Sequence, residues 1–283
     1  MAEYSYQVID GIKCYNPDTA LSNDYYPPEA YDDLFKLEHN NFWFKARNRL
    51  IIYLFKKYVP KNRELKTLEI GCGTGYVLRG LKRFSNLKLF GAEIFLRGLR
   101  FASQRLPDVE FLQLDAANLQ FISEFDIICT FDVLEHIEDD KKTIKNIYTA
   151  LKDNGLYFIS VPQHKFIWGA IDELSNHKRR YSKKELINKI TEAGFKVLYT
   201  SSFVFSLFPF MIVSRLLNRK ALPKNKDNNE DLFHELKIMK PINNLFYFFM
   251  MVDELLIKMS LKLPFGGSLI MVTKKENKGI GRK

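Results

Sequence analysis

Two kinds of apolar pattern alternate along this chain. Short runs rich in Val, Ile, Leu and Phe alternate with longer stretches in which apolar residues recur every three or four positions. The first pattern is typical of strands covered on both faces, and the second of amphipathic helices. This alternation predicts an α/β protein with a mostly parallel sheet. The expected strands are residues 67–70, 87–92, 109–114, 125–131, 156–161, 195–199 and 268–273, and the expected helices are residues 42–55, 76–84, 95–105, 141–151 and 182–193.

Local signals mark some of these boundaries. Ser182 and Glu185 form a capping-box pattern at the start of a helix, and Gly194 follows its end. The sequence Asp-Asn-Gly at 153–155 predicts a turn before the fifth strand. Residues 1–30 show no sustained period and predict an irregular arm.

Residues 203–267 separate the last two strands and contain two apolar segments. Residues 203–217 are interrupted by Pro209 and fall short of the ~20 residues that a membrane span needs. Residues 241–262 carry apolar side chains along one face and are separated from the first segment by a polar linker at 222–231. Two such helices beside a basic surface would lie in a membrane interface, hold a polyprenyl-like chain or pack on the sheet as a lid.

The expected organisation has four parts. They are an N-terminal arm and cap helix (1–60), a core (61–202), a helical insertion (203–267) and a last strand with a flexible tail (268–283).

Composition narrows the class of protein. With 283 residues, 46% of them hydrophobic, the chain can bury a full core. Three scattered cysteines and a start without a secretory pattern favour a cytoplasmic location. The net charge of +10 arises in the C-terminal half. It indicates an anionic partner (nucleic acid, an acidic membrane surface or a phosphorylated substrate) or a solvated basic face.

The candidate chemistry begins where the first strand ends in Gly71, Gly73 and Gly75. Alternating glycines allow positive φ and let a ligand approach the backbone. A dinucleotide fingerprint would need glycine at position 76, which is Tyr76. Glu93 ends the next strand, where a carboxylate can accept hydrogen bonds from both hydroxyls of a ribose. An adenosine-containing ligand without a pyrophosphate fits both facts.

The Glu-x-Gly-x-Gly-x-Gly run at 69–75, with Glu93 after it, resembles the first motifs of the class I S-adenosylmethionine-dependent methyltransferases, type 11/12. The resemblance covers roughly residues 40–200. It implies a Rossmann-like, seven-stranded, mostly parallel sheet whose last strand inserts antiparallel, with an N-terminal helical arm and a helical insertion. It also implies S-adenosylmethionine as cofactor and S-adenosylhomocysteine as product.

The resemblance also implies cofactor contacts. Glu69 and the glycines would shape the methionyl site, and Asp115 would face the adenine, although an Asp at a strand end is often a turn former. Arg47 would lie near the methionyl carboxylate or on the surface. The full expected set is Arg47, Glu69, Gly71, Cys72, Gly73, Gly75, Glu93, Ile94, Asp115, Ala116 and Phe131.

Two histidines are candidate catalytic bases. His136 follows Asp132 and Glu135 at the carboxyl edge of the sheet, and His177 lies in a later loop. An imidazole suits proton abstraction near neutral pH. The Asp-x-x-Glu-His pattern also resembles quinone-biosynthesis O-methyltransferases, in which these residues can hold a divalent cation. We expect no metal, because three ligands are few for a hard cation and the pair can simply open a helix.

Residues 168–181 form a polar, aromatic and basic stretch without a core pattern. Charged residues on such a loop are typical of substrate recognition, or they cap neighbouring carboxylates. The Asp-Glu, His and Arg-Arg-Tyr elements resemble methyltransferases encoded with bacterial surface-polysaccharide and lipid-linked glycan enzymes. The expected substrate contacts are Trp168, Asp172, Arg179, Arg180 and Tyr181.

The predicted function is methyl transfer to a small molecule, at an oxygen of a sugar, lipid-linked glycan or quinone-like metabolite. Nucleic acid is not an expected partner, because the sequence contains no RNA-binding module. An RNA methyltransferase and a non-catalytic cofactor-binding partner of a membrane-bound glycan assembly are the alternatives. Peripheral contact with the inner membrane face is compatible with the apolar insertion, and the oligomeric state is open.

Overall fold

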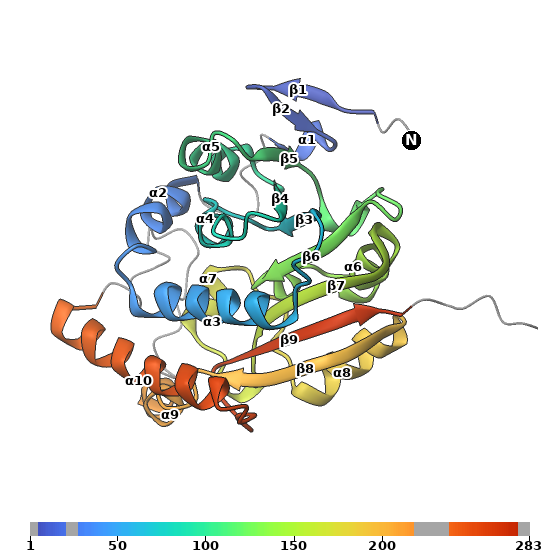
Figure 1. Ribbon diagram of the computed structural model, residues 1–283. Helices are drawn as coiled ribbons and strands as arrows, with labels where there is room; N and C mark the ends of the chain where they lie inside the picture. Colours follow the sequence, from blue (N-terminus) through green and yellow to red (C-terminus); the bar gives the residue numbers. More distant parts are fainter. Residues whose placement is uncertain (1–4, 21–27, 218–237, 277–283) are drawn as a thin grey trace, which may run out of the picture.

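A single nine-stranded sheet organises the molecule (Figure 1). The structure is a computed structural model and describes residues 5–20, 28–217 and 238–276. The strand order is β1-β2-β5-β4-β3-β6-β7-β9-β8. The strands are β1 (Gln7–Ile9), β2 (Ile12–Cys14), β3 (Leu65–Ile70), β4 (Leu87–Glu93), β5 (Glu110–Gln113), β6 (Phe125–Phe131), β7 (Leu151–Pro162), β8 (Phe195–Phe203) and β9 (Ser268–Lys275).

Helices connect these strands and cover both faces of the sheet (Figure 1). They are α1 (Pro17–Ala20), α2 (Pro28–Leu37), α3 (Phe42–Tyr58), α4 (Tyr76–Leu81), α5 (Leu96–Arg105), α6 (Asp140–Ala150), α7 (Ala170–Leu174), α8 (Lys183–Glu192), α9 (Phe208–Leu217) and α10 (Lys240–Lys258). Short 3₁₀ turns occur at Ala116–Asn118, Leu134–His136 and Lys165–Ile167.

The seven predicted strands all form, and the topology agrees with the expected class. Strands β3 to β7 run parallel, whereas β9 lies antiparallel between β7 and β8. The chain order reverses between β3 and β6. In open α/β sheets, the crevice at this reversal, beyond the carboxyl ends of the strands, is where ligands bind.

The N-terminal arm is more regular than predicted, and this accounts for the two additional strands. Strands β1 and β2 form a hairpin in which Ile9 pairs with Ile12, and β2 extends the sheet beside β5. Asp10 and Gly11 form the two-residue turn with φ of 51° and 77°. Asp-Gly is a strong hairpin signal. The prediction of an irregular arm was wrong here because each strand is only three residues long, too short to show a period.

Several other boundaries differ from the predictions. Helix α4 ends at Leu81, three residues before the expected end, and β3 begins at Leu65, two residues before the expected start. The expected turn at 153–155 lies within β7, where Asn154 has a φ of 62° and the pairing with β6 is irregular. Strand β8 continues to Phe203, beyond the expected end at 199. Helix α7 forms inside the expected loop at 168–181, so that this stretch is partly ordered as helix.

The core lies on both faces of the sheet. Helices α3, α4, α5 and α10 contribute to the cluster on one face, and α6 and α8 to that on the other. On the first face, the rings of Phe55 and Phe158 stack at 4.3 Å. On the second face, buried Tyr157 shares a 2.7 Å hydrogen bond with Thr130. This two-sided burial explains the nearly continuous apolar character of the central strands.

Helix α10 of the insertion packs along α3 (Figure 1). The Phe42 amide donates to Asn243 Oδ1 at 2.8 Å, the rings of Phe42 and Phe246 meet at 5.3 Å, and Arg49 pairs with Glu254 at 2.8 Å. Among the described helices, none combines the length and hydropathy that crossing a bilayer requires. The predicted linker at 222–231 and the last part of the predicted tail, 277–283, lie outside the described residues.

Candidate functional site

The glycine turn after β3 has a backbone that side chains would disturb. Gly71 and Gly73 have φ of 70° and 52°, in the left-handed region that favours glycine. A Cβ on Gly71 would overlap the side chain of Val133, which follows β6. A Cβ on Gly73 would meet only Leu34, at 3.7 Å. The turn therefore depends on glycine, and its backbone is open to the adjoining cavity.

Glu93 links this turn to the end of β4. Its carboxylate accepts hydrogen bonds from the amides of Gly73, at 3.0 Å, and Ile94, at 2.8 Å. Burial raises the pKa of Glu93, while these two amides oppose the rise. The carboxylate is thus fixed at the carboxyl edge of the sheet, where it lines the cavity.

A second support for the turn was not predicted from the sequence. Buried Glu38, just after α2, accepts a 2.6 Å hydrogen bond from the Thr74 hydroxyl and pairs with Arg105. Arg105 also donates to the Thr74 carbonyl at 3.0 Å. The N-terminal segment thereby holds the turn from outside. These contacts join residues at least 31 positions apart, and no local pattern signals them.

Glu69 lies under the turn with an unsatisfied carboxyl group. It is 2% exposed, and its Oε2 has no hydrogen-bond partner among the described residues. Burial raises the pKa of Glu69 to about 8, although the positive charge of nearby Arg47 has the opposite effect on this pKa. An unpartnered buried oxygen that lines a cavity is a group available for a polar ligand.

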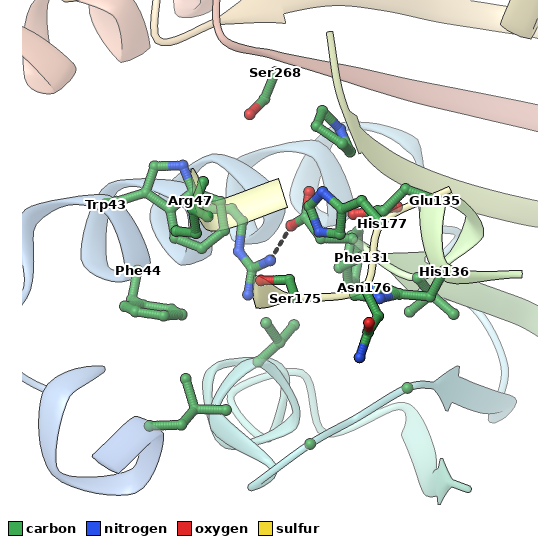
Figure 2. A pocket seen from close by; sticks show the side chains of 18 of the residues that line it. Trp43, Phe44, Arg47, Phe131, Glu135, His136, Ser175, Asn176, His177 and Ser268 are labelled. Atoms are coloured by element: carbon green, nitrogen blue, oxygen red, sulfur yellow. Dashed lines mark hydrogen bonds and ion pairs between the residues drawn. The ribbon is translucent and has the colours of Figure 1, made fainter. Parts of the chain in front are cut away.

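Arg47 projects from α3 toward the end of β6 (Figure 2). It pairs with Asp132, and its guanidinium lies over the Trp43 ring at 4.4 Å. Asp132 has a φ of 58° and also accepts a hydrogen bond from the Ser160 hydroxyl at 3.1 Å. The side chains of this pair are only 10% and 19% exposed, so the charges compensate each other in a largely desolvated site.

One cavity of about 990 Å³ joins these groups. All the predicted cofactor residues except Gly75 line it; Gly75 packs against Ala102 of α5. Asp115 lines the cavity and also caps the following 3₁₀ turn, accepting from the Ala117 amide at 2.9 Å. The cavity continues past His136 and His177 to the inner sides of α9 and α10, where Met211 and Phe246 line it.

Glu135, His136 and His177 cluster on one side of this cavity, opposite Trp43 and Phe44 in the view of Figure 2. The two imidazole rings meet edge to face at 4.7 Å. Burial and the neighbouring His177 ring lower the pKa of His136 to about 3, so His136 is neutral at physiological pH. Burial, with the nearby Asp132 charge, raises the pKa of Glu135 well above its usual range.

Among the described residues, these three side chains form the one group that could hold a metal ion. Their potential ligand atoms lie within 4.8 Å of one another. Both carboxyl oxygens of Glu135 lack a hydrogen-bond partner among the residues described. His177 thus takes the place in the candidate metal set that was predicted for Asp132, which is paired with Arg47. Two imidazoles and one carboxylate would suit a transition metal better than a hard cation.

His177 is held by a fully buried carboxylate. Its Nδ1 lies 2.8 Å from Asp172 Oδ1. Asp172 also accepts from Arg180 Nε at 2.8 Å and from the Gly169 amide at 2.8 Å. Burial opposes ionisation of Asp172, but the bonds and charges of His177 and Arg180 outweigh it and lower its pKa. With Nδ1 committed to the carboxylate, the free nitrogen of His177 is Nε2.

The remaining predicted substrate residues have different surroundings. Arg180 lines the cavity, whereas Trp168, Arg179 and Tyr181 do not. Trp168 donates to Glu173 at 2.6 Å, and both Arg179 and Tyr181 contact Asp140, at 3.0 and 2.7 Å. Asp172 does not line the cavity either. Substrate contact stays a prediction for all five residues.

Known methyltransferases resemble this chain in sequence and fold. A family model described as a methyltransferase domain matches residues 38–200. A probable S-adenosylmethionine-dependent methyltransferase of Mycobacterium tuberculosis is 25% identical over 162 residues, which cover 56% of this chain and 57% of that protein. The chain thus matches little more than half the length of this relative.

Two further similarities agree with the family match. A ubiquinone/menaquinone biosynthesis C-methyltransferase of Campylobacter jejuni is 24% identical over 208 residues, covering 62% of this chain and 86% of that protein. The solved structure of Haemonchus contortus phosphoethanolamine N-methyltransferase 2, in complex with phosphomonomethylethanolamine and S-adenosylhomocysteine, has a TM-score of 0.57. It is 17% identical and covers 90% of this chain and 59% of that chain, which shows a shared fold.

Proposed function

The chain belongs to the class I S-adenosylmethionine-dependent methyltransferases, and from this premise we propose that it transfers a methyl group to an oxygen of an amphipathic small molecule. The observation that carries the proposal is the single cavity. It joins the glycine turn and Glu93 at one end to His177 and the apolar insertion at the other. A cofactor and an acceptor can therefore share one cavity.

The residues at the first end fit the family's cofactor. The Gly71 and Gly73 backbone leaves room for a methionyl group, and the Glu93 carboxylate can accept from the ribose hydroxyls. The unpartnered Glu69 oxygen is available to a cationic amino group. When bound, the cofactor supplies an electrophilic methyl group on a sulfonium.

We assign the general base to His177. With its Nδ1–H donated to Asp172, its Nε2 can take the proton of an acceptor hydroxyl, and the buried carboxylate stabilises the imidazolium that forms. His136 is a weaker base because its pKa is about 3. We propose that the neutral His136 ring and the Glu135 carboxyl group, whose pKa is raised by burial, position the acceptor oxygen by hydrogen bonds.

The acceptor end combines apolar and cationic groups. Phe42, Leu207 and Phe246 supply apolar surface, whereas Lys178 and Arg215 also line the cavity. This mixture suits a molecule with a hydrocarbon part and an oxygen-rich or anionic part. A lipid-linked sugar is the acceptor class that fits best, and quinone-like metabolites and nucleotide-linked sugars are the other candidates.

A transfer assay with cofactor carrying a labelled methyl group tests the acceptor class. The protein would be incubated with separate pools of lipid-linked glycans, nucleotide sugars, quinones and RNA. We expect labelled product in the lipid-linked pool, extractable into organic solvent and absent for a His177→Ala variant. Label only in RNA would favour the RNA methyltransferase alternative. No label in any pool, from protein that binds the cofactor, would favour a non-catalytic partner.

A further inference from the structure

The outer sides of α9 and α10 are apolar although they face solvent. Of the seventeen large hydrophobic side chains that are exposed among the described residues, twelve lie between positions 210 and 265. On α10, Leu245, Phe248 and Leu255 are 52%, 59% and 57% exposed, and Met259, directly after the helix, is 65% exposed. Their spacing places them along one stripe of the helix. A solvent-facing helix surface would ordinarily be polar.

This stripe is separate from the packed side of the same helix. Met250 and Ile257, 3% and 1% exposed, belong to the core against the sheet. The adjacent α9 contributes Phe210, which is 57% exposed and lies 6.1 Å, ring to ring, from Phe249 of α10. The two helices therefore present one continuous apolar surface, which we call the α9–α10 face. Contiguous apolar surface of this kind marks an interaction site.

In the described residues of α9, α10 and their flanks, the exposed charges have one sign. Lys240, Lys258 and Lys262 are exposed at the ends of α10 or just beyond it. Asp253 and Glu254 are the carboxylates of the described residues 204–217 and 238–267, and both are buried. Asp253 accepts from the Ser206 amide at 3.0 Å. Glu254 is paired with both Arg49 and Lys258, so that Lys240 and Lys262 supply the charge at the two ends of the stripe. An exposed apolar stripe with lysines and without exposed acids complements an anionic lipid surface.

The same surface is continuous with the acceptor end of the cavity. Met211 and Ser214 of α9 and Phe246 of α10 line the cavity. Phe210 belongs to both surfaces, because it lines the cavity and is also 57% exposed. A lipid surface in contact with the α9–α10 face would thus lie one helix layer away from the acceptor end. A second copy of the chain fits less well, because a two-fold contact would bring lysines of like sign together.

We propose that the α9–α10 face binds the interface of an anionic bilayer, so that an acceptor anchored in the lipid reaches the cavity beneath these helices. The helices lie in the interface and do not cross it. The inference rests on the proposed methyl transfer only for the role of the acceptor. Membrane binding itself is independent of turnover and can be measured separately.

Vesicle flotation of the full chain tests this directly. We expect binding to phosphatidylcholine vesicles that contain phosphatidylglycerol, weaker binding to phosphatidylcholine alone, and loss of binding at high salt. The double variant Phe248→Glu/Leu255→Glu should reduce the partition coefficient about tenfold or more, because it replaces exposed apolar anchors with charges that the lipid repels. Neither residue lines the cavity.

The matched control is Val8→Glu/Ile122→Glu, which adds the same charge at two exposed apolar positions outside the α9–α10 face. This control should bind vesicles like the wild type. Titration with S-adenosylhomocysteine shows whether each variant is folded. Equal vesicle binding by both double variants would overturn the proposal, as would no binding by wild-type protein that still binds S-adenosylhomocysteine. The proposal would also be overturned if the wild type does not bind vesicles but forms a dimer that Phe248→Glu/Leu255→Glu dissociates and the control does not. The α9–α10 face would then bind a second copy of the chain.

Discussion

Replacement of His177 by alanine is expected to lower turnover by about 10²–10⁴-fold, the usual contribution of a positioned general base. The reason is geometric. Asp172 lies 2.8 Å from His177 Nδ1, which leaves Nε2 free to accept a proton, and His177 lines the same cavity as the cofactor residues. Affinity for S-adenosylhomocysteine should remain within about twofold, because an interaction made only during transfer does not strengthen ground-state binding. Steady-state kinetics and a binding titration measure the two effects.

Two controls make this result specific. His164→Ala removes a ring that contacts Phe166 at 5.2 Å and does not line the cavity, so its turnover should match the wild type. Added imidazole should partly restore the activity of His177→Ala. If turnover is unchanged in His177→Ala, in His136→Ala and in the double variant, proton abstraction by histidine is not part of the reaction.

Replacement of Asp172 by alanine is expected to cause the largest loss of stability. The change leaves Arg180, whose side chain is 5% exposed, as an uncompensated buried charge, and it also releases His177 and the Gly169 amide. Loss of one partner of a buried pair typically costs about 3–5 kcal/mol in the free energy of unfolding. Denaturant unfolding measures this. The double variant Asp172→Ala/Arg180→Ala should recover part of the loss, since no unpaired charge remains.

The same pair predicts a pH dependence. The pKa of Asp172 is lower in the folded protein than its usual value of 3.8, so its contribution to stability is present above that value and is lost as pH falls through the folded pKa. The stability difference between wild type and Asp172→Ala should therefore narrow in acid. Glu192→Ala, which removes an exposed partner of Lys141, is the control and should change little. A constant difference down to the acid unfolding transition would contradict the ionised pair.

Much of the fold could be predicted from the sequence, because the patterns that indicate it are local. Strand periods, the glycine turn and the cap at Ser182, which accepts from the Glu185 amide at 3.1 Å, all arise within a few residues. The position of Glu93 could be predicted because the parallel β3 and β4 end at the same edge. The hairpin β1–β2 was missed because its strands are three residues long, although the Asp10-Gly11 pair was a usable turn signal.

The chemistry of the site was harder to predict than the fold, because it depends on contacts between segments that are distant in the sequence. Nothing near Glu38 indicates that it holds Thr74, and nothing near Arg47 indicates its pairing with Asp132, because these pairs form only when α2 and α3 pack on the sheet. By contrast, Asp172 and His177 are five positions apart, so their pairing could have been suggested from the sequence. The exposure of one side of α10 could not be predicted from the sequence, since a buried helix and an interfacial helix share the same apolar pattern.

The central claim is that the glycine turn and Glu93 bind S-adenosylmethionine beside the acceptor end of one cavity. Calorimetric titration with S-adenosylhomocysteine tests this most directly, with Glu93→Ala as the informative variant and Glu110→Ala, a half-exposed partner of Lys13, as the control. We predict one-to-one binding of micromolar affinity to wild type and control. The affinity of Glu93→Ala should be lower by about 10²-fold or more, because this variant cannot accept the two charge-assisted hydrogen bonds from the ribose hydroxyls. Absence of heat from the wild type, with no competition by S-adenosylmethionine, would contradict the account.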